Sequence, residues 1–437
     1  MLATDLQIAG RNLLRHTRRN LFLGGALAAV TGLLVLLSSL TAGIESAMME
    51  SATTLMTGHV NVGGFFKITS GSAAPLVSDY PRVLEAARKV VPDDELDYVA
   101  VRGRGFSKAV SELSSMDLVL AGVDVAREPT FEKVIRPVEG RIADLAQPGA
   151  MLLFQGQAER LKVKVGDVIT LSAPTSRGVN NTADVRVVVI ARNVGLLSAF
   201  SAFIEQGTLW RLYGLKATTT GAIHLYLNRP DEAALVASRL RAALAEAGWR
   251  VMDPDAQPYW MKLMRTVPGE DWTGQKLDVT TWEDELADFR KFMFGVQVLT
   301  TLLVSVLLSV VIIGILNTLA IAIRERTREI GTLRAIGMQR RKVLWLFVLE
   351  AALLGLAGAA GGALVAALVA AGVNLRGIAI PESWQLFLVQ ERLTFLLQPR
   401  WILLHVALLV GVTTVAALLP ALRAARLKPV TAMHHIG

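Results

Sequence analysis

The longest uncharged stretch of the chain runs from Phe292 to Ile323 and reads FMFGVQVLTTLLVSVLLSVVIIGILNTLAIAI. A helix that crosses a bilayer needs about 20 consecutive, mostly apolar residues, and this stretch exceeds that length. Three further runs meet the same requirement, namely Leu21–Thr41, Val343–Val373 and Trp401–Leu422. Charged residues make up 19% of the 437 residues, whereas soluble proteins carry about 25%. The sequence therefore predicts an α-helical membrane protein with four transmembrane helices.

Basic residues gather beside these apolar runs. The net charge of the chain is +8, yet residues 44–290 hold 27 Lys and Arg against 31 Asp and Glu, a net charge of −4 (27 − 31). The basic excess lies in residues 1–20, 324–342 and 423–437. This is the positive-inside pattern, and it argues against a nucleic-acid partner. It predicts that both termini are cytoplasmic and that the large segment between the first two runs is extracytoplasmic.

The runs and their flanks predict an order of segments along the chain. Residues 1–20 form a cytoplasmic interfacial helix, because Leu2, Leu6, Ala9 and Leu13 recur at helical spacing; a solvated basic leader is the alternative. The following segments are a first transmembrane helix at 21–43, an outer α+β domain with a stalk at 44–290, a second helix at 291–323, a cytoplasmic loop at 324–342, a third helix at 343–373, an outer loop at 374–400, a fourth helix at 401–422 and a cytoplasmic tail at 423–437.

The first apolar run could also be the core of a secretory signal peptide. Signal peptides have a shorter apolar region of about 7–15 residues and a small-residue cleavage site. The run Leu21–Thr41 is longer, and no site of the A-x-A type closes it. We therefore expect an uncleaved anchor.

Polar residues inside the runs are expensive in lipid and are candidates for function. Glu350 lies in the third run and Asn317 in the second. Glu350 either has a functional role, or it pairs with a polar neighbour such as Asn317 or reaches the cytoplasmic face. The third run also carries Gly355, Gly358, Gly361 and Gly362, which predict close packing of helices.

The outer segment reads as mixed helix and strand. The patterns predict helices at 81–91, 155–165 and 231–247, and strands at 117–123, 168–173, 184–191 and 223–227. In the third helix we expect Asp231 to be the N-cap and Leu235, Leu240 and Leu244 to face the core. Residues 253–281 hold several Pro and Gly with Trp260 and Trp272, which indicates a loop with exposed aromatic residues.

Motifs for catalysis and for metal binding are missing from the sequence. There is no G-x-x-x-x-G-K-[ST], no H-E-x-x-H and no G-x-S-x-G, and the chain has no cysteine. His59 and His224 are isolated, and His434 and His435 lie in the tail. We therefore expect no catalytic residue, no metal site, no cofactor bound by this chain and no enzyme activity of its own.

The loop after the second run carries a specific motif. Asn317-Thr318-Leu319 is followed by R-E-R-T-R-E-I-G-T-L-R-A-I-G from Arg324 to Gly337. Further motifs are Gly58-His59-Val60, Gly122-Val123-Asp124, LKVKVGDVITL from Leu161 to Leu171, and PALRAARLKP from Pro420 to Pro429. Together these motifs resemble the ABC transporter permeases of the MacB, FtsX and LolC/LolE superfamily. The resemblance implies a MacB-like periplasmic core domain of α+β fold in residues 44–290 and a location in the bacterial inner membrane.

In that superfamily the loop is a coupling helix that docks on a separate ATPase. The resemblance implies that two ATPase subunits and a second permease chain, identical or paralogous, are partners, and that ATP and Mg are used by the ATPase. The alternative is a basic loop that only sets topology, but this alternative does not explain the glutamates or the apolar face formed by Ile330, Leu333 and Ile336. The residues predicted to couple the ATPase are Arg324, Glu325, Arg326, Arg328, Glu329, Ile330, Gly331, Leu333, Arg334, Ile336 and Gly337.

The large outer segment and the approach to the second helix at Trp282 resemble most closely the LolC/LolE-type permeases. This implies release of lipoproteins from the inner membrane to a periplasmic carrier by mechanotransmission. Acyl chains would then leave the bilayer along apolar residues at the outer ends of the first two helices, namely Leu36, Leu40, Val296 and Leu299. The alternative is that these residues only face lipid. The alternatives are MacB-like efflux of a peptide or small amphiphile and FtsX-like activation of a cell-wall hydrolase.

Overall fold

The computed structural model describes residues 7–11, 13, 17–69, 72–175, 178–194, 198–325, 332, 334–380 and 392–426. The chain divides into two compact units. The helical unit comprises Met1–Glu45, Phe294–Ala379 and Arg392–Gly437, and the α/β unit comprises Ser46–Met293 and Ile380–Glu391.

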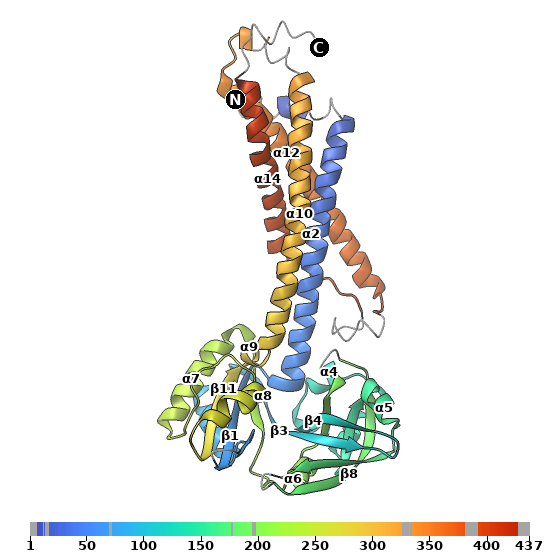
Figure 1. The fold of residues 1–437 in the computed structure, drawn as a ribbon, viewed down its shortest axis with the longest axis vertical. Helices are drawn as coiled ribbons and strands as arrows, with labels where there is room; N and C mark the ends of the chain where they lie inside the picture. Colours follow the sequence, from blue (N-terminus) through green and yellow to red (C-terminus); the bar gives the residue numbers. More distant parts are fainter. Residues whose placement is uncertain are drawn as a thin grey trace. The chain divides into compact units, whose positions relative to one another are not determined.

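Long apolar helices make up the helical unit (Figure 1). They are α2 (Thr17–Ala52), α10 (Ala287–Glu325), α12 (Arg340–Arg376) and α14 (Pro399–Ala425). Among the described residues, these four are long and apolar enough to cross a membrane. They contain the four runs that the sequence predicted to be transmembrane. Along the chain, α2 continues past Glu45 and α10 begins before Phe294, so each helix extends into the sequence of the α/β unit.

Glycines allow α12 to pack closely against its neighbours in the helical unit. A Cβ atom at Gly358 would lie 2.8 Å from the carbonyl oxygen of Gly24, and one at Gly362 would lie 2.1 Å from that of Ala28. The same atom at Gly355 would lie 2.3 Å from the hydroxyl of Thr413. The predicted close packing is therefore present at three of the four glycines, because nothing lies within 4 Å of a Cβ at Gly361.

The described part of the α/β unit contains one sheet of 11 strands in the order β11-β1-β10-β3-β4-β9-β6-β8-β5, with β2 beside β1 and β7 beside β3 and β8. The pairs β4–β9 and β6–β8 are parallel, and the others are antiparallel. The strands are β1 (Val60–Thr69), β2 (Ser72–Ala74), β3 (Leu96–Val110), β4 (Ser115–Val123), β5 (Pro137–Gly140), β6 (Ala150–Phe154), β7 (Val168–Pro174), β8 (Asn180–Ala191), β9 (Ser201–Glu205), β10 (Ala222–Leu227) and β11 (Gly274–Thr281).

Strand β3 joins two lobes of this sheet. Residues up to Arg102 pair with β10, and residues from Gly103 onward pair with β4. The first lobe consists of β1, β2, β10, β11 and the first half of β3, and it buries an apolar core under α3 (Tyr80–Val90) and α7 (Ala233–Glu246) (Figure 1). The second lobe consists of β4 to β9 with the rest of β3.

Shorter helices complete the α/β unit. In the second lobe they are α4 (Phe131–Val134), α5 (Gln155–Leu161) and α6 (Gln206–Tyr213), with turns at Val125–Arg127 and Ile142–Ala146. The first lobe adds Pro230–Glu232, α8 (Tyr259–Met261), Lys262–Thr266, Val267–Gly269 and α9 (Trp282–Glu285). The predicted helix at 81–91 and the four predicted strands match α3, β4, β7, β8 and β10 within a few residues.

Two expectations for the outer segment are wrong. Asp231 is not an N-cap, because residues 230–232 form a separate 3-10 turn and α7 begins at Ala233. Leu235 is exposed while Leu240 and Leu244 are buried, because five residues at about 100° each place Leu235 well away from the face of Leu240.

Residues 253–281, which the sequence predicted to be a loop, contain regular secondary structure. They contain α8, two short turns and the whole of β11. The ring of Trp272 is half-buried, and the ammonium groups of Lys67 and Lys276 lie 5.0 and 5.9 Å from its centre. Trp260, by contrast, is exposed as predicted.

The glycine contacts predict a difference between two adjacent substitutions. Gly362→Leu should destabilise the full chain by about 1–3 kcal/mol, because the new side chain would overlap the backbone of α2. Gly361→Leu is the matched control and should leave the thermal midpoint of the purified protein nearly unchanged. Equal loss in the two variants would show that the α2–α12 contact does not limit stability.

Candidate coupling junction

The first long helix enters the α/β unit through a π-helical turn. Helix α2 ends at Ala52, and residues Thr53–Thr57 form the turn, which Gly58 closes by donating its N–H to the carbonyl of Thr53 at 2.8 Å. Gly58 has φ +62°, and a Cβ there would lie 2.9 Å from the Cβ of His224. Only glycine avoids both the strain and the collision, so the chain can turn directly into β1.

A buried arginine binds two carbonyls of this turn. The guanidinium of Arg102 donates to the carbonyl of Leu55 at 2.5 Å and to that of Thr54 at 2.7 Å. The hydroxyl of Tyr226 lies 3.1 Å from the carbonyl of Thr53 and 3.0 Å from that of Thr54. Carbonyls at a helix C-terminus have no partner within the helix and carry partial negative charge, so a buried cation satisfies them well.

Glu128 balances the charge of Arg102. The Nε of Arg102 lies 3.1 and 3.0 Å from the two carboxylate oxygens of Glu128, and both side chains are 2% exposed. Burial alone would lower the pKa of Arg102, but the charge of Glu128 outweighs it and raises that pKa. The guanidinium therefore remains charged. We call Arg102, Glu128 and Tyr226 the helix clamp, and Arg102 stands where β3 passes from the first lobe to the second.

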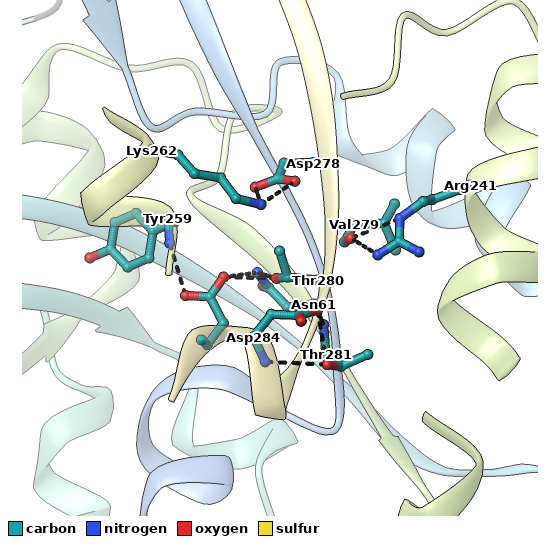
Figure 2. Close-up of polar contacts among 10 residues, drawn as sticks. Asn61, Arg241, Tyr259, Lys262, Asp278, Val279, Thr280, Thr281 and Asp284 are labelled. Atoms are coloured by element: carbon teal, nitrogen blue, oxygen red, sulfur yellow. Dashed lines mark hydrogen bonds and ion pairs between the residues drawn. The ribbon is translucent and has the colours of Figure 1, made fainter. Parts of the chain in front are cut away.

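The short helix α9, which precedes the second long helix, begins with a capping box. The hydroxyl of Thr281, at the end of β11, accepts a hydrogen bond from the N–H of Asp284 at 3.3 Å. The carboxylate of Asp284 accepts from the N–H of Thr281 at 2.8 Å (Figure 2). These reciprocal bonds satisfy two N–H groups at the start of a helix and fix its direction. Strand β11 thus leads through α9 into α10.

The carboxylate of Glu285 collects hydrogen bonds from three elements. It accepts from the hydroxyl of Thr280 on β11 at 2.7 Å and from the amide of Asn61 on β1 at 3.3 Å. Its other oxygen accepts from the N–H of Tyr259 at 3.1 Å. Asn61 also donates to the hydroxyl of Thr280 at 3.0 Å (Figure 2). The first turn before α10 is therefore bonded to both neighbouring strands and to the segment around α8.

A buried ion pair lies beside this network. The ammonium of Lys262 lies 3.0 Å from each carboxylate oxygen of Asp278 (Figure 2). Burial raises the pKa of the Asp278 carboxyl to about 6, because the loss of hydration outweighs the attraction of Lys262. On the other side of β11, the guanidinium of Arg241 donates to the carbonyl of Val279 at 2.7 Å and ties α7 to the strand.

The ends of the two helices meet on adjacent strands. Val60, the first residue of β1, pairs with Thr281, the last residue of β11. The N–H of Trp282 donates to the carbonyl of His59 at 3.1 Å, and the ring of His59 accepts from the N–H of Leu227 at 2.8 Å. Both helices therefore join the first lobe at one place, which we call the junction.

The predicted coupling loop lies partly outside the described residues. This applies to Arg326, Arg328, Glu329, Ile330, Gly331 and Leu333, and the side chains of Arg324 and Glu325 are likewise not described. In the described part, Arg334 donates to the carbonyl of Ala425 at 3.2 Å, and Gly337 has φ +105°. The side chain of Ile336 is 80% exposed, which leaves an apolar group free for contact.

The remaining predicted site residues lie in the helical unit. Glu350 is buried and Asn317 is exposed. Leu36 and Leu40 are half-buried, whereas Val296 and Leu299 on α10 are exposed. No group of three or more His, Cys, Asp or Glu that could hold a metal ion occurs among the described residues.

Sequence reasoning did not identify the residues of the junction, apart from the motif Gly58-His59-Val60 and Trp282. Arg102, Glu128, Glu285, Lys262 and Asp278 have no unusual spacing or neighbours in the sequence. Each is an ordinary charged residue within a strand or a short turn. Their pairing follows from the sheet order, which single-sequence patterns do not provide.

Comparison with known proteins finds a family match for the C-terminal part of the chain. The FtsX-like permease C-terminal family matches residues 301–429. A pyoverdine export ATP-binding/permease protein, PvdT of Pseudomonas entomophila, is 35% identical over 121 residues, which cover 28% of this chain and 16% of that protein. The macrolide export ATP-binding/permease protein MacB of Escherichia coli is 33% identical over 160 residues, which cover 36% of this chain and 23% of that protein.

Solved structures with some likeness are outer domains of such proteins. The periplasmic region of MacB from Actinobacillus actinomycetemcomitans has a TM-score of 0.32 and 10% identity, covering 53% of this chain and 92% of that one. The extracellular domain of the noncanonic ABC-type transporter YknZ has a TM-score of 0.30 and 11% identity, covering 43% and 94%. The sequence matches confirm the resemblance to the MacB and FtsX superfamily, and they span less than a quarter of the curated relatives' length. Closeness to LolC/LolE stays a prediction.

The helix clamp predicts a large effect of one substitution. Arg102→Met should destabilise the α/β unit by about 3–5 kcal/mol, because it leaves Glu128 buried and unpaired. The double variant Arg102→Met with Glu128→Gln should recover part of this loss. Urea unfolding of the full chain followed by tryptophan fluorescence would measure both. Arg127→Met is the control, since Arg127 pairs with Asp124 on the surface, and it should have little effect.

Asp278 predicts a pH dependence of stability. Its pKa in the folded protein is about 6, whereas an unfolded aspartate titrates near 3.9. The folded state therefore binds more protons between these values, and the free energy of unfolding falls as pH rises through this window. Between pH 4.5 and pH 7.5 the deprotonation of Asp278 lowers the free energy of unfolding by about 2 kcal/mol, because each pH unit below the folded pKa of about 6 accounts for about 1.4 kcal/mol.

Asp278→Asn should remove this contribution. The difference between the melting temperatures of the full chain at pH 4.5 and at pH 7.5 should be smaller in the variant than in the wild type. Asp124→Asn, at an exposed carboxylate, is the control and should keep the wild-type profile. Parallel profiles for Asp278→Asn and the wild type would contradict the raised pKa.

Proposed function

We propose that this chain is the permease subunit of an ABC transporter of the MacB and FtsX type and that it works with an ATPase on a separate chain. The observation that carries the proposal is the junction, where α2 and α10 join adjacent strands of one sheet. The FtsX-like match over residues 301–429 supports the same class. In this proposal, ATP hydrolysis moves the helices and the α/β unit does work outside the membrane.

The contacts at the junction suit the transmission of movement. The end of α2 is held by charged hydrogen bonds from Arg102, and the start of α9 by the capping box and Glu285. Charge-assisted hydrogen bonds are about twice as strong as neutral ones. Arg102 also lies where β3 passes from the first lobe to the second. A displacement of α2 would therefore act on both lobes through β3.

The ATPase is proposed to dock on the loop 324–342. The motif from Arg324 to Gly337 supports this by its resemblance to the coupling helix of the superfamily. Ile336 supports it by its exposed apolar side chain, which lies on the same predicted helical face as Ile330 and Leu333 in the sequence. The ATPase dimer would bind ATP and Mg, and a second permease chain, identical or paralogous, would complete the transporter.

The proposed location is the bacterial inner membrane, with both termini in the cytoplasm and residues 44–290 in the periplasm. The basic residues beside the apolar runs support this orientation, because cytoplasmic flanks carry an excess of Lys and Arg. The predicted segments 21–43, 291–323, 343–373 and 401–422 would then be the membrane spans.

The favoured work is release of lipoproteins to a periplasmic carrier. Lipid-anchored cargo is held by about 0.8 kcal/mol per buried methylene, so extraction needs an apolar surface that replaces lipid. Helix α10 offers exposed apolar residues, namely Phe294, Val296, Val298, Leu299, Leu302 and Val306. On the same helix, Gln297, Thr301, Ser305 and Ser309 lie between them and make this surface amphipathic. Leu36 and Leu40 on α2 would extend this route.

Export of a peptide or small amphiphile is the second candidate. It is favoured by the relatives, whose names describe pyoverdine export and macrolide export. The same junction and the same ATPase would serve this function. The difference lies in the cargo and in the outer partner, which would be an export channel instead of a lipoprotein carrier.

The experiment is depletion of the chain in its bacterium, followed by complementation with variants and proteomics of the separated membranes. Depletion should raise the amount of lipoprotein in the inner membrane several-fold, and the wild-type chain should restore it. Ile336→Asp and Glu329→Lys should fail to restore it, and they should co-purify at least fivefold less ATPase because the docking surface is altered.

Leu375→Asp is the matched control, because Leu375 is also an exposed apolar residue but lies at the far end of α12. It should behave as the wild type. An unchanged lipoprotein distribution after depletion would reject lipoprotein release and favour export. Wild-type amounts of ATPase with Ile336→Asp and Glu329→Lys would show that the loop only sets topology.

A further inference from the structure

We propose that the α/β unit contains a binding site for a single-chain amphiphile with an anionic head group, in a cleft between the two lobes. The cleft has a volume of about 640 Å³, and ligand pockets usually measure about 300–1,000 Å³. Its walls come from β1 and β2, from the middle of β3, from Pro174, Thr175 and Gly178, and from Tyr213 and Leu215 at the end of α6. This inference goes beyond the proposed function and does not depend on the ATPase.

The walls of the cleft are mostly apolar. Ile68 and Phe106 are large apolar residues that are exposed there, and Leu76, Leu215 and Leu263 add to the lining. The phenol of Tyr213 also faces the cleft, but its hydroxyl already donates to the carbonyl of Phe106 at 2.8 Å. Such a lining binds hydrocarbon well, whereas a peptide would need partners for a backbone N–H and C=O at every residue.

One charged side chain lies in this lining. Arg104 is 8% exposed, and one of its nitrogens donates to the amide oxygen of Asn61 at 3.0 Å. The ring of Tyr259 lies 4.2 Å from the centre of its guanidinium. Within the described part of the chain, Arg104 forms no ion pair with a carboxylate, and Glu285 is connected to it through Asn61 and Tyr259.

Arg102 has an anionic partner, and Arg104 lacks one among the described residues. Arg102, two residues earlier on β3, is 1% exposed and has Glu128 and two carbonyls as partners. A guanidinium has five N–H donors, and a buried cation without an anion is costly. Arg104 is one of the residues that line the apolar cleft. An anionic head group with an apolar tail supplies both missing partners, and carboxylate and phosphate share the required chemistry.

The test uses the full chain in lipid nanodiscs, without detergent that could fill the cleft. A photoactivatable dodecanoate should label the peptides that contain Phe106 and Leu263, as mapped by mass spectrometry. Dodecanoate and monododecyl phosphate should compete with this labelling, and the stronger of the two identifies the head group. Dodecanol and dodecyltrimethylammonium should compete at least tenfold more weakly, because they lack the anion.

Arg104→Gln should reduce labelling of the cleft at least tenfold while labelling of the lipid-facing helix α10 stays unchanged. Arg127→Gln, at an exposed arginine, should leave both unchanged. If Arg104→Gln does not fold, Leu263→Trp decides, because it fills the cleft with Arg104 intact and should abolish labelling. Wild-type labelling in a folded Arg104→Gln or in Leu263→Trp, or equal competition by dodecanol, would overturn the proposal.

Discussion

The α/β unit depends on one buried guanidinium. The last carbonyls of the first long helix end inside a protein core, where no water can satisfy them. Arg102 donates to two of these carbonyls and is neutralised by Glu128, so the end of the helix, strand β3 and the segment before α4 are held by one charge. Without this arrangement, the helix would have to end at the surface. A helix ending at the surface could not act directly on the seam between the lobes.

The second helix is attached by different means. Its start is fixed by the capping box of Thr281 and Asp284 and by the carboxylate of Glu285, which bonds to β1, β11 and the segment at Tyr259. The first helix is thus bound at its C-terminal end by a cation, as the direction of the helix dipole favours. The short turn before the second helix is bound by carboxylates. Since β1 and β11 are neighbours, the two attachments reinforce each other.

The helices and much of the α/β unit could be predicted from sequence, because lipid demands long apolar runs and strands show apolar alternation. Leu235 and Asp231 were assigned wrongly, since the helical period and the local turn decide those positions. The clamp and the Lys262–Asp278 pair could not be found, because their partners are brought together by sheet order alone. The loop motif was recognisable, but most of its residues lie outside the described part of the chain.

The pairing of β1 with β11 also constrains how the protein is made. Strand β1 follows the first helix directly, but its partner β11 comes at the far end of the outer segment. In the proposed orientation, the edge of β1 that pairs with β11 stays largely open during synthesis until almost the whole segment has been translocated, whereas its other edge can pair earlier with β10. Pairings between distant parts of a sequence form slowly and expose strand edges meanwhile. A nascent chain of this design is expected to need chaperones on the outer side of the membrane.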